Sequence, residues 1–256
     1  MKPKKISTLI WLQYLIELLV IIAGILGAFA LENWNEKRQE KQLIREVMLE
    51  IAENLEYNLF DLRPDSEIHY QGYLSNIKVQ NYLASDTTYH PNMCFDFHFL
   101  QKEEYSYPNK TGFDRLKGLD VKVLEQDSFV EQITRIYDYY FPRISKGQSL
   151  YPDIRDYFHP FYQANFESNE DPNLEYDFVI TGDTIHYPFI YEVEGWGVVQ
   201  TIGYVPKDFD ALKNDAAFRS LLKETLEFRV FKYSRYQQLI NSSEDLIQQI
   251  RTKYGE

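Results

Sequence analysis

The feature that most constrains this chain is an apolar stretch from Leu9 to Leu31 that contains a single carboxylate, Glu17. The hydrocarbon core of a bilayer is about 30 Å thick, and a helix needs about 20 apolar residues to cross it. At about 1.5 Å per residue, the stretch would be roughly 35 Å long as a helix. We therefore predict a transmembrane helix over residues 8–31.

The charges at the start of the chain predict the orientation of this helix. Lys2, Lys4 and Lys5 precede it with no acidic residue among them. Because cationic residues are enriched on the cytoplasmic side of a membrane, residues 1–7 are expected in the cytoplasm and the rest of the chain outside it. Seven residues are too few for an output domain, so any signal should pass to another membrane protein.

A cleaved signal peptide is the alternative interpretation of the same segment. The basic start fits this alternative, and the run from Ala28 to Ala30 resembles an A-x-A cleavage site. The apolar stretch is longer than the roughly 7–15 residues of a signal sequence, and a glutamate lies inside it. These two observations favour an uncleaved membrane anchor.

Charge and missing motifs narrow the function classes. The formal net charge is −12, and the first 31 residues hold three lysines and one glutamate, so the remainder carries −14. Such a domain repels polyanions at long range, and nucleic-acid binding is not expected. The sequence contains no nucleophile-elbow, zinc-protease or phosphate-loop motif. We therefore predict a protein that is not an enzyme and has no cofactor.

Hydrophobic periodicity predicts a mainly α-helical domain beyond the span. Residues 32–63 lack Gly and Pro and carry an apolar stripe from Ile44 to Leu62. The span should therefore continue into a long membrane-proximal helix. Pro64 is expected to end this helix, because the residue before a proline is forced out of the helical region. Residues 64–173 are then expected to form a region of shorter helices.

Three shorter helices are predicted in that region. The first covers residues 65–84 and the last covers residues 152–166. The second follows a capping-box pair, Ser128 and Glu131, and Pro142 is expected to close it. In a capping box, the hydroxyl and the carboxylate satisfy two backbone donors at the start of a helix.

Residues 174–205 differ in character and predict a β-rich insertion. Two β-prone runs flank Gly182-Asp183, as in a hairpin with a two-residue turn. The run from Tyr191 to Tyr204 could add a strand or form a loop. An isolated hairpin is marginally stable in water, so this insertion should pack on the helices.

Residues 206–256 are expected to contain a long C-terminal helix with Asp215 as its N-cap. Four of its apolar residues fall at heptad spacing: Tyr233, Ile240, Ile247 and Tyr254. Six more widen the stripe: Leu222, Leu226, Tyr236, Leu239, Leu246 and Ile250. This helix should lie antiparallel against the 32–63 helix. The predicted fold class is thus mainly α: one transmembrane helix that continues into a long helix, and an extracytoplasmic helical bundle with a small β-hairpin insertion.

Four motifs mark both ends and the middle of the chain. They are LVIIAGILGAFALENWNE at 19–36, LEIAENL at 49–55, TGFDRLKG at 111–118 and DAAFRSLL at 215–222. With a glutamate early in the span and an Asn-Trp-Asn-Glu exit, the chain resembles a large family of uncharacterised single-span envelope proteins of Gram-negative bacteria, labelled a domain of unknown function. The resemblance implies a bacterial inner-membrane protein whose bulk is periplasmic, and it implies no activity.

Glu17 is the centre of the first candidate site. Successive helical residues turn by about 100°, so Gly24, Ala28 and Asn35 lie on nearly the same face as Glu17. Small residues allow a second helix to approach closely, and polar side chains hydrogen-bond across. A buried carboxylate in a membrane either binds a partner or carries protons, and both alternatives stay open. The candidate residues for helix packing or ion coupling are Gln13, Glu17, Gly24, Gly27 and Ala28.

The exit from the span is the second candidate site. It consists of Asn33, Trp34, Asn35 and Glu36. Trp34 suits the interface between lipid and water, where aromatic residues are enriched. The asparagine side chains could also pin adjacent protomers where the helices leave the lipid.

A weak candidate for a metal site follows the first long helical region. His90, Cys94 and His98 are spaced i, i+4, i+8, so on a helix they would share one face. Phenylalanines alternate at 95, 97 and 99, which suits a strand instead. We therefore predict no metal.

These observations favour a non-enzymatic interaction, sensing or scaffold subunit that is anchored in the membrane. Its expected partners are the lipid bilayer and, through the transmembrane helix, a second copy or another integral membrane protein. The alternative is an accessory subunit of an ion-coupled motor or transporter that uses the intramembrane carboxylate Glu17.

Overall fold

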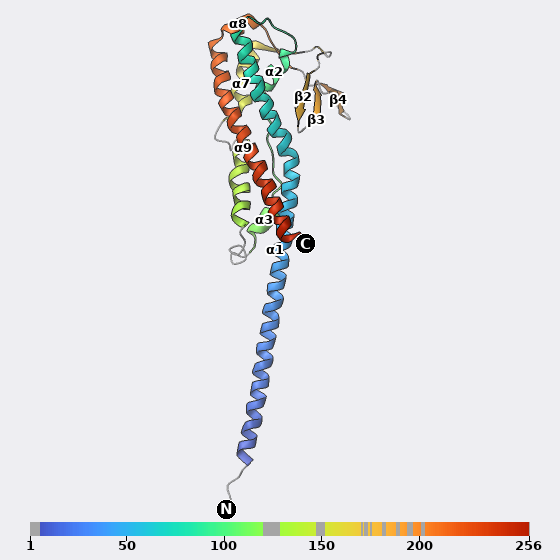
Figure 1. The fold of residues 1–256 in the computed structure, drawn as a ribbon, viewed down its shortest axis with the longest axis vertical. Helices are drawn as coiled ribbons and strands as arrows, with labels where there is room; N and C mark the ends of the chain where they lie inside the picture. The colour runs from blue at the N-terminus through green and yellow to red at the C-terminus, as the bar shows by residue number, and fades with distance from the viewer. Residues whose placement is uncertain are drawn as a thin grey trace, which may run out of the picture.

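Helix α1 organises the structure. In the computed structural model of the protein, α1 runs from Ile6 to Ala84, 79 residues. Its N-terminal part, up to residue 43, projects from the bundle, and we call this part the stalk. The remainder of α1 belongs to a helical bundle (Figure 1). The chain is mainly helical, as the sequence predicts. The structure describes residues 6–119, 129–146, 152–169, 171, 174, 176–180, 183–187, 190–193, 197–200 and 203–255.

α1 continues through Pro64, so the prediction that this residue ends the helix is wrong. A proline cannot donate a hydrogen bond to the carbonyl four residues earlier, which here belongs to Phe60. Phe60 is 78% exposed, so water can hydrate that carbonyl. Leu62 and Ser66 are buried on either side of the proline. Packing of both flanks holds the backbone helical, and residues 65–84 become the last turns of α1.

The C-terminal helix α9 (Ala216–Tyr254) lies antiparallel along α1 (Figure 1). At one end, Arg219 Nη2 donates to the carbonyl of Leu83 at 3.2 Å. At the other end, Arg45 Nε donates to the carbonyl of Tyr254 at 2.7 Å. The predicted N-cap is confirmed, because the side chain of Asp215 accepts a hydrogen bond from the Phe218 amide at 2.9 Å.

The buried face of α9 differs from the predicted heptad. The side chains that face the core follow a strict alternation of three and four residues: Leu222, Thr225, Arg229, Lys232, Tyr236, Leu239, Ser243, Leu246 and Ile250. Ile240 and Ile247 are buried at the edge of this row, whereas Tyr233 and Tyr254 are only half-buried. The row contains five members of the predicted wider stripe, namely Leu222, Tyr236, Leu239, Leu246 and Ile250, and it adds four polar or charged residues that the apolar pattern did not include.

Short helices fill the space beside the α1–α9 pair. They are α2 (Met93–Gln101), α3 (Thr111–Lys117), α5 (Val130–Thr134), the π-helical segment η1 (Arg135–Tyr140), α6 (Phe141–Ile144), α7 (Ile154–Asn165) and α8 (Phe209–Asn214). α7 confirms the helix predicted over residues 152–166.

The prediction that Pro142 closes a helix is wrong. α5, η1 and α6 form one helical run that ends at Ile144. Hydrogen bonds in a π segment reach the fifth residue rather than the fourth, as when the Phe141 amide donates to the carbonyl of Ile136. The shift in bonding lets Pro142 start a new α-helical turn, where its missing N–H is tolerated. Ser128 of the predicted capping box lies outside the described residues.

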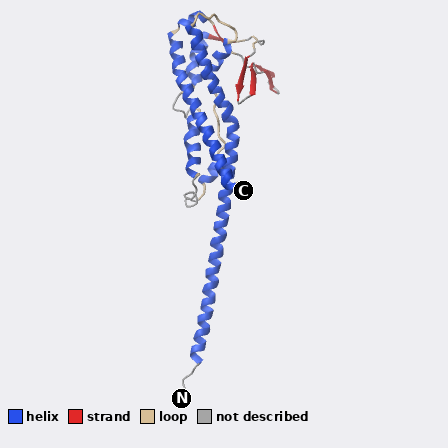
Figure 2. Ribbon diagram, in the orientation of Figure 1, coloured by secondary structure: helices blue, strands red, loops and turns tan. Residues whose placement is uncertain are grey.

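Among the described residues, the strands form three two-stranded antiparallel sheets. One pair, β1 with β6, belongs to the far end of the bundle, whereas the other strands lie to one side of the helices (Figure 2). The pairs are β1 (Phe166–Ser168) with β6 (Tyr204–Pro206), β2 (Tyr176–Ile180) with β3 (Asp183–Tyr187), and β4 (Ile190–Val193) with β5 (Gly197–Gln200). The predicted hairpin is present, but Asp183, which was predicted as a turn residue, is the first residue of β3 and pairs with Ile180. Gly182 lies outside the described residues. Part of the run from Tyr191 to Tyr204 forms strands.

Two hydrophobic cores lie along the bundle. The core nearer the stalk joins α1, α3, the 130–144 run and α9, and includes Ile51, Leu55, Ile133 and Leu246. The core at the far end joins the last turns of α1 to α2, α7, α8 and the start of α9, and it is rich in aromatic rings. Tyr162 stacks on Phe166 there with ring centroids 4.2 Å apart.

Two of the sequence motifs contact each other in the core nearer the stalk. The side-chain oxygen of Asn54, in LEIAENL, accepts hydrogen bonds from the Gly112 amide at 2.8 Å and the Thr111 hydroxyl at 2.9 Å, both in TGFDRLKG. Glu50 and Arg115 of the same motifs form an ion pair. α1 therefore caps the start of α3 with its own side chain, in the role that an N-cap residue usually plays.

Gly112→Ala should destabilise the protein because α3 starts in direct contact with α1. A Cβ at Gly112 would lie 2.8 Å from Cγ1 of Ile51 and 2.9 Å from its backbone nitrogen. Overpacking of this kind typically costs about 1–3 kcal/mol. The matched control is Gly27→Ala, since no atom lies within 4 Å of a Cβ there. Urea unfolding in detergent should separate the two variants, and equal midpoints would contradict the packing of α3 on α1.

Candidate functional site

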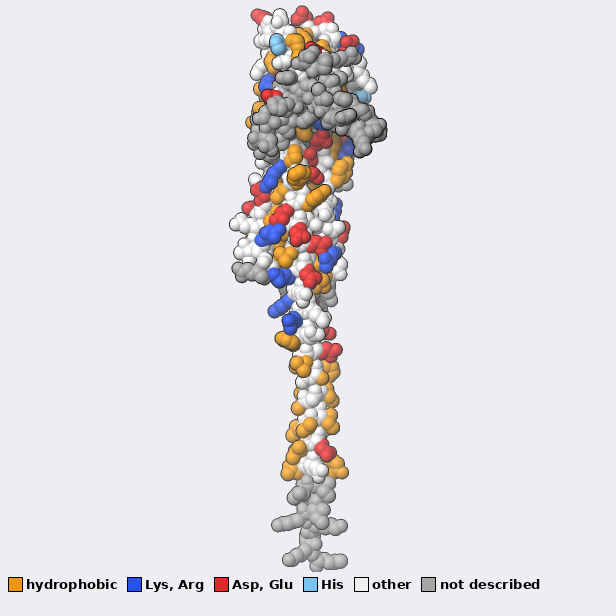
Figure 3. All heavy atoms as spheres, turned by 90° about the vertical axis from the view of Figure 1, so that its right-hand side faces the viewer, with side chains coloured by type: hydrophobic (Ala, Val, Ile, Leu, Met, Phe, Trp, Pro, Cys, Tyr) orange, Lys and Arg blue, Asp and Glu red, His pale blue; other side chains and the backbone are white. Residues whose placement is uncertain are grey.

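The N-terminal part of α1 is a candidate membrane span by length and composition. Its most apolar window contains no buried residue, so this part of α1 is not a core helix of the bundle. Figure 3 shows hydrophobic side chains around the stalk, whereas charged side chains cluster where the stalk meets the bundle. The apolar surface of the stalk has no protein partner among the described residues.

The structure places most of the predicted packing residues on one side of the stalk. In a helix with about 100° per residue, Glu17, Gly24, Ala28 and Asn35 lie within about 20° of a common direction, and Gln13 lies within about 40°. Gly27 lies about 80° away and does not belong to this face. All of these side chains are exposed, and no atom lies within 4 Å of a Cβ built at either glycine.

The exit motif is helical, and its side chains point in several directions. Asn33, Trp34, Asn35 and Glu36 are consecutive exposed residues of α1, so their side chains fan around the helix. Only Asn35 continues the direction of Glu17. The guanidinium of Arg38 lies 5.8 Å from the centre of the Trp34 ring, a cation–π contact along the helix. That the asparagines pin adjacent protomers stays a prediction.

The structure does not place the three weak metal candidates on one helix. Cys94 and His98 belong to α2, whereas His90 precedes its first residue, Met93. Burial raises the pKa of the Cys94 thiol to about 12 and lowers the pKa of His98 to about 4. Within the part of the chain that the structure describes, no group of three His, Cys, Asp or Glu side chains could hold a metal ion.

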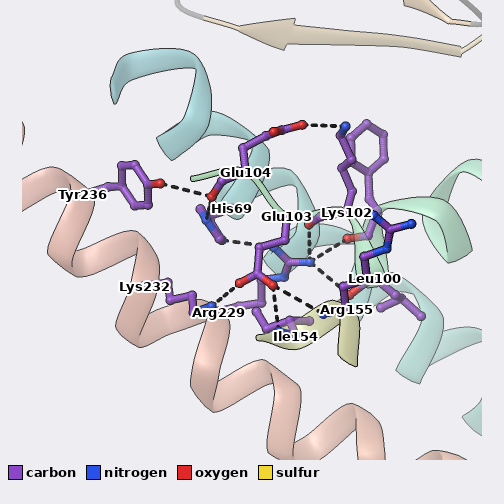
Figure 4. A network of polar contacts seen from close by, with 11 residues as sticks. His69, Leu100, Lys102, Glu103, Glu104, Ile154, Arg155, Arg229, Lys232 and Tyr236 are labelled. Atoms are coloured by element: carbon purple, nitrogen blue, oxygen red, sulfur yellow. Dashed lines mark hydrogen bonds and ion pairs between the residues drawn. The ribbon is translucent and has the colours of Figure 1, made fainter. Parts of the chain in front are cut away.

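Sequence reasoning missed a buried charged centre around Arg229 of α9 (Figure 4). The Arg229 side chain is 1% exposed. Its Nη2 donates to the carbonyls of Phe99 at 3.1 Å, Leu100 at 3.0 Å and Lys102 at 2.6 Å. These carbonyls end α2, where a helix leaves unpaired acceptors and carries partial negative charge. The guanidinium therefore caps α2 from the side.

A carboxylate in the same centre holds the start of another helix. Glu103 is paired with the ammonium of Lys232, and both side chains are almost fully buried. Oε2 of Glu103 accepts hydrogen bonds from the backbone amides of Ile154 at 2.8 Å and Arg155 at 3.4 Å. The start of a helix carries partial positive charge, so the negative charge of Glu103 is favourable at the start of α7.

His69 of α1 completes the centre, and its partners fix its tautomer. Arg229 Nη1 lies 3.1 Å from His69 Nδ1, and a guanidinium can only donate, so Nδ1 carries no proton. The remaining nitrogen, Nε2, then holds the proton and faces the carbonyl of Glu104 at 3.4 Å. Burial lowers the pKa of His69 well below 6.5, and the charges of Arg229 and Lys232 lower it further. The imidazole is neutral.

The centre joins four helices. Its charged groups bind backbone atoms at helix ends and each other. Gly72 of α1 makes room for it, since a Cβ at Gly72 would lie 2.6 Å from Cζ of Arg229. Tyr236 also donates from its hydroxyl to the carbonyl of Glu104 at 3.2 Å. The arrangement suits structural joining of α1, α2, α7 and α9. A signal in the sequence was available, because Arg229 and Lys232 fall in the three-four row of core positions.

Arg229→Leu should cost much more stability than removal of a surface arginine from the same helix. The change leaves three buried carbonyls and Nδ1 of His69 without their donor, and breaking such a centre typically costs about 3–5 kcal/mol. The control is Arg251→Leu, whose ion pair with Glu56 is 48% and 44% exposed, so that water and salt screen it and its contribution to stability is small. Urea unfolding measures both. Similar losses would show that Arg229 is not a structural centre.

His69 should make the protein less stable as the pH falls. Its folded-state pKa lies below the unfolded value of 6.5, so the unfolded chain takes up a proton first. The free energy of unfolding should therefore decrease below about pH 6.5, by up to about 1.4 kcal/mol per pH unit for this group. His69→Gln retains an acceptor for Arg229 and should flatten the decrease between pH 6.5 and 4. An unchanged slope would contradict a neutral buried imidazole.

Comparison of the chain with protein-family models, with curated proteins and with solved structures finds no match.

Proposed function

We propose that this chain is a non-enzymatic interaction or scaffold subunit of a bacterial inner membrane. Residues 8–31 cross the bilayer, residues 1–7 lie in the cytoplasm and the helical bundle lies in the periplasm. The bundle meets a partner or ligand, and α1 carries the consequence to a helix packed beside its span.

The observation that carries this proposal is the continuity of α1. One helix holds an apolar surface with no buried residue at one end and supplies core residues such as Ile51 and Leu62 at the other. A continuous helix transmits rotation and displacement along its axis, because each turn is hydrogen-bonded to the next. A flexible linker between an anchor and a domain would not do so.

The way α9 ends supports the same proposal. The last carbonyl of α9, that of Tyr254, accepts a hydrogen bond from Arg45, close to the point where α1 leaves the bundle. α1 and α9 therefore form a stiff antiparallel pair down to the base of the bundle. Between Leu31 and Ile44, every residue of α1 is exposed, and this stretch of about 18 Å joins the candidate span to the bundle.

The buried charges that the structure describes are bound within the bundle. Arg229 binds carbonyls at the end of α2, and Glu103 binds an amide at the start of α7. Lys232 forms an ion pair with Glu103. A second buried carboxylate, Asp96, accepts hydrogen bonds from Ser75 at 2.8 Å and from Tyr82 at 2.9 Å. Groups bound in this way favour a protein whose polar interior positions helices over one that turns over a substrate.

The topology can be tested on the full chain with a membrane-impermeant maleimide. Cys94 is buried and its thiol pKa is raised to about 12, so it should remain unlabelled. Lys117→Cys, exposed on α3, should react in intact spheroplasts, whereas Lys4→Cys should react only after lysis. The protein should stay in the membrane after an alkaline wash, with an intact mass that includes residue 1. Loss of about 30 N-terminal residues would support the signal-peptide alternative and refute the anchor.

A further inference from the structure

One face of α1 stays uncovered where the helix passes through the bundle. Ile51, Leu55 and Leu62 point into the core, whereas Tyr57 and Phe60 are 65% and 78% exposed. Such exposure is unusual for large aromatic side chains on a structured helix. Further along α1, Ile68 is partly buried, and it packs against a small cluster of Cys94, Phe95 and Phe99.

The uncovered face is continuous with the face of the stalk that holds Glu17. Eighteen residues make about five helical turns, so Glu17, Asn35 and Glu53 point in nearly the same direction. Tyr57 and Phe60 lie within about 40° of that direction. We use the name outer face for the exposed row Asn35, Gln42, Glu46, Glu53, Tyr57 and Phe60.

Charges are sorted along the two edges of the outer face. In the stretch between span and bundle, one edge is acidic and carries Glu32, Glu36 and Glu40. The other edge is basic and carries Arg38, Lys41 and Arg45. All six side chains are exposed, and the outer face lies between the two rows, centred on Asn35 and Gln42.

This sorting works against the isolated helix. Opposite charges four residues apart stabilise a helix, and like charges destabilise it. Here the charged pairs at that spacing are all alike: Glu32 with Glu36, Glu36 with Glu40, Lys37 with Lys41, and Lys41 with Arg45. A spacer that had only to stay helical in water would gain from the opposite arrangement. The pattern becomes favourable when a neighbouring helix brings the complementary edge.

We propose that the outer face binds a second copy of this chain in a parallel, two-fold dimer. The inference rests on the proposed function, because insertion in one membrane forces both stalks to run in the same direction. A two-fold axis beside the outer face sets the acidic edge of each copy against the basic edge of the other. It also places Tyr57 of each copy on the same side of the interface as Phe60 of the other copy.

The outer face fits a second helix better than it fits lipid. Tyr57 is 26 residues beyond Leu31, so it lies about 39 Å above the end of the apolar stretch. Lipid headgroups extend only a few ångströms beyond the hydrocarbon core and cannot reach it. Within the stalk, Gly24 and Ala28 lie in line with the outer face and leave room for close approach of the same neighbour.

Disulfide cross-linking of the full chain in membranes tests the dimer. A two-fold axis brings identical positions of the outer face together, so Asn35→Cys and Gln42→Cys should each form a covalent dimer. Lys37→Cys is the matched control, because it is exposed at the same height on the opposite side of α1. The dimer fraction should be at least tenfold lower for this control. Equal yields at all three positions, or none at residues 35 and 42, would overturn the proposal.

Charge reversal tests the pairing of the edges. In the Gln42→Cys chain, Glu36→Lys with Glu40→Lys makes both edges basic and should reduce the cross-linked dimer several-fold. Arg38→Glu with Lys41→Glu makes both edges acidic and should do the same. Co-expression of the two reversed chains should restore a mixed dimer. Independence from all of these changes would refute charge pairing.

The outcomes also separate this inference from the proposed function. If the maleimide experiment places the chain in the membrane but no cross-link forms, the anchor stands and the second copy is excluded. A different membrane protein recovered with the chain in mild detergent would then be the partner. If the chain is not in the membrane, both proposals fail.

Discussion

The antiparallel packing of α9 on α1 is the interaction on which the rest of the structure depends. The two helices are paired from Arg45 to Leu83, and each shorter element is attached to this pair. α3 starts on the side chain of Asn54, and α2 and α7 are held by their ends at Arg229 and Glu103. α1 therefore provides the axis along which these short helices are attached.

The buried charges show how the short helices are oriented as well as attached. A guanidinium placed at the end of α2 and a carboxylate at the start of α7 complement the partial charges of those helix ends. Burying Arg229, Lys232 and Glu103 would be very costly without such partners. Apolar side chains could fill the same volume but would not distinguish one end of a helix from the other. The charged centre therefore specifies direction, whereas the hydrophobic cores supply the burial.

Sequence periodicity predicted the long elements. It failed where contacts with distant segments of the chain determine the local structure. The C-terminal helix, its Asp215 cap, α7 and the β2–β3 hairpin follow from local patterns, and all are present. Pro64 and Pro142 were misjudged because a local rule for proline was applied where packing and a π segment compensate. Arg229 was missed because its acceptors lie about 130 residues away, on carbonyls that no side-chain pattern reveals. Glu17 is exposed on α1, and the role of its carboxylate stays a prediction.

The exposed stretch of α1 between the candidate span and the bundle, residues 32–43, has few contacts that stabilise it. Most helical stability in proteins comes from tertiary packing of one helix face. Residues 32–43 have no such packing, and their like charges at i, i+4 cost about 0.2–0.5 kcal/mol per pair. The helix is held from both ends, by the apolar segment below and by α9 above. Because these residues lack such packing, the approach of another helix there would add it, and the link between the candidate span and the bundle would become more rigid.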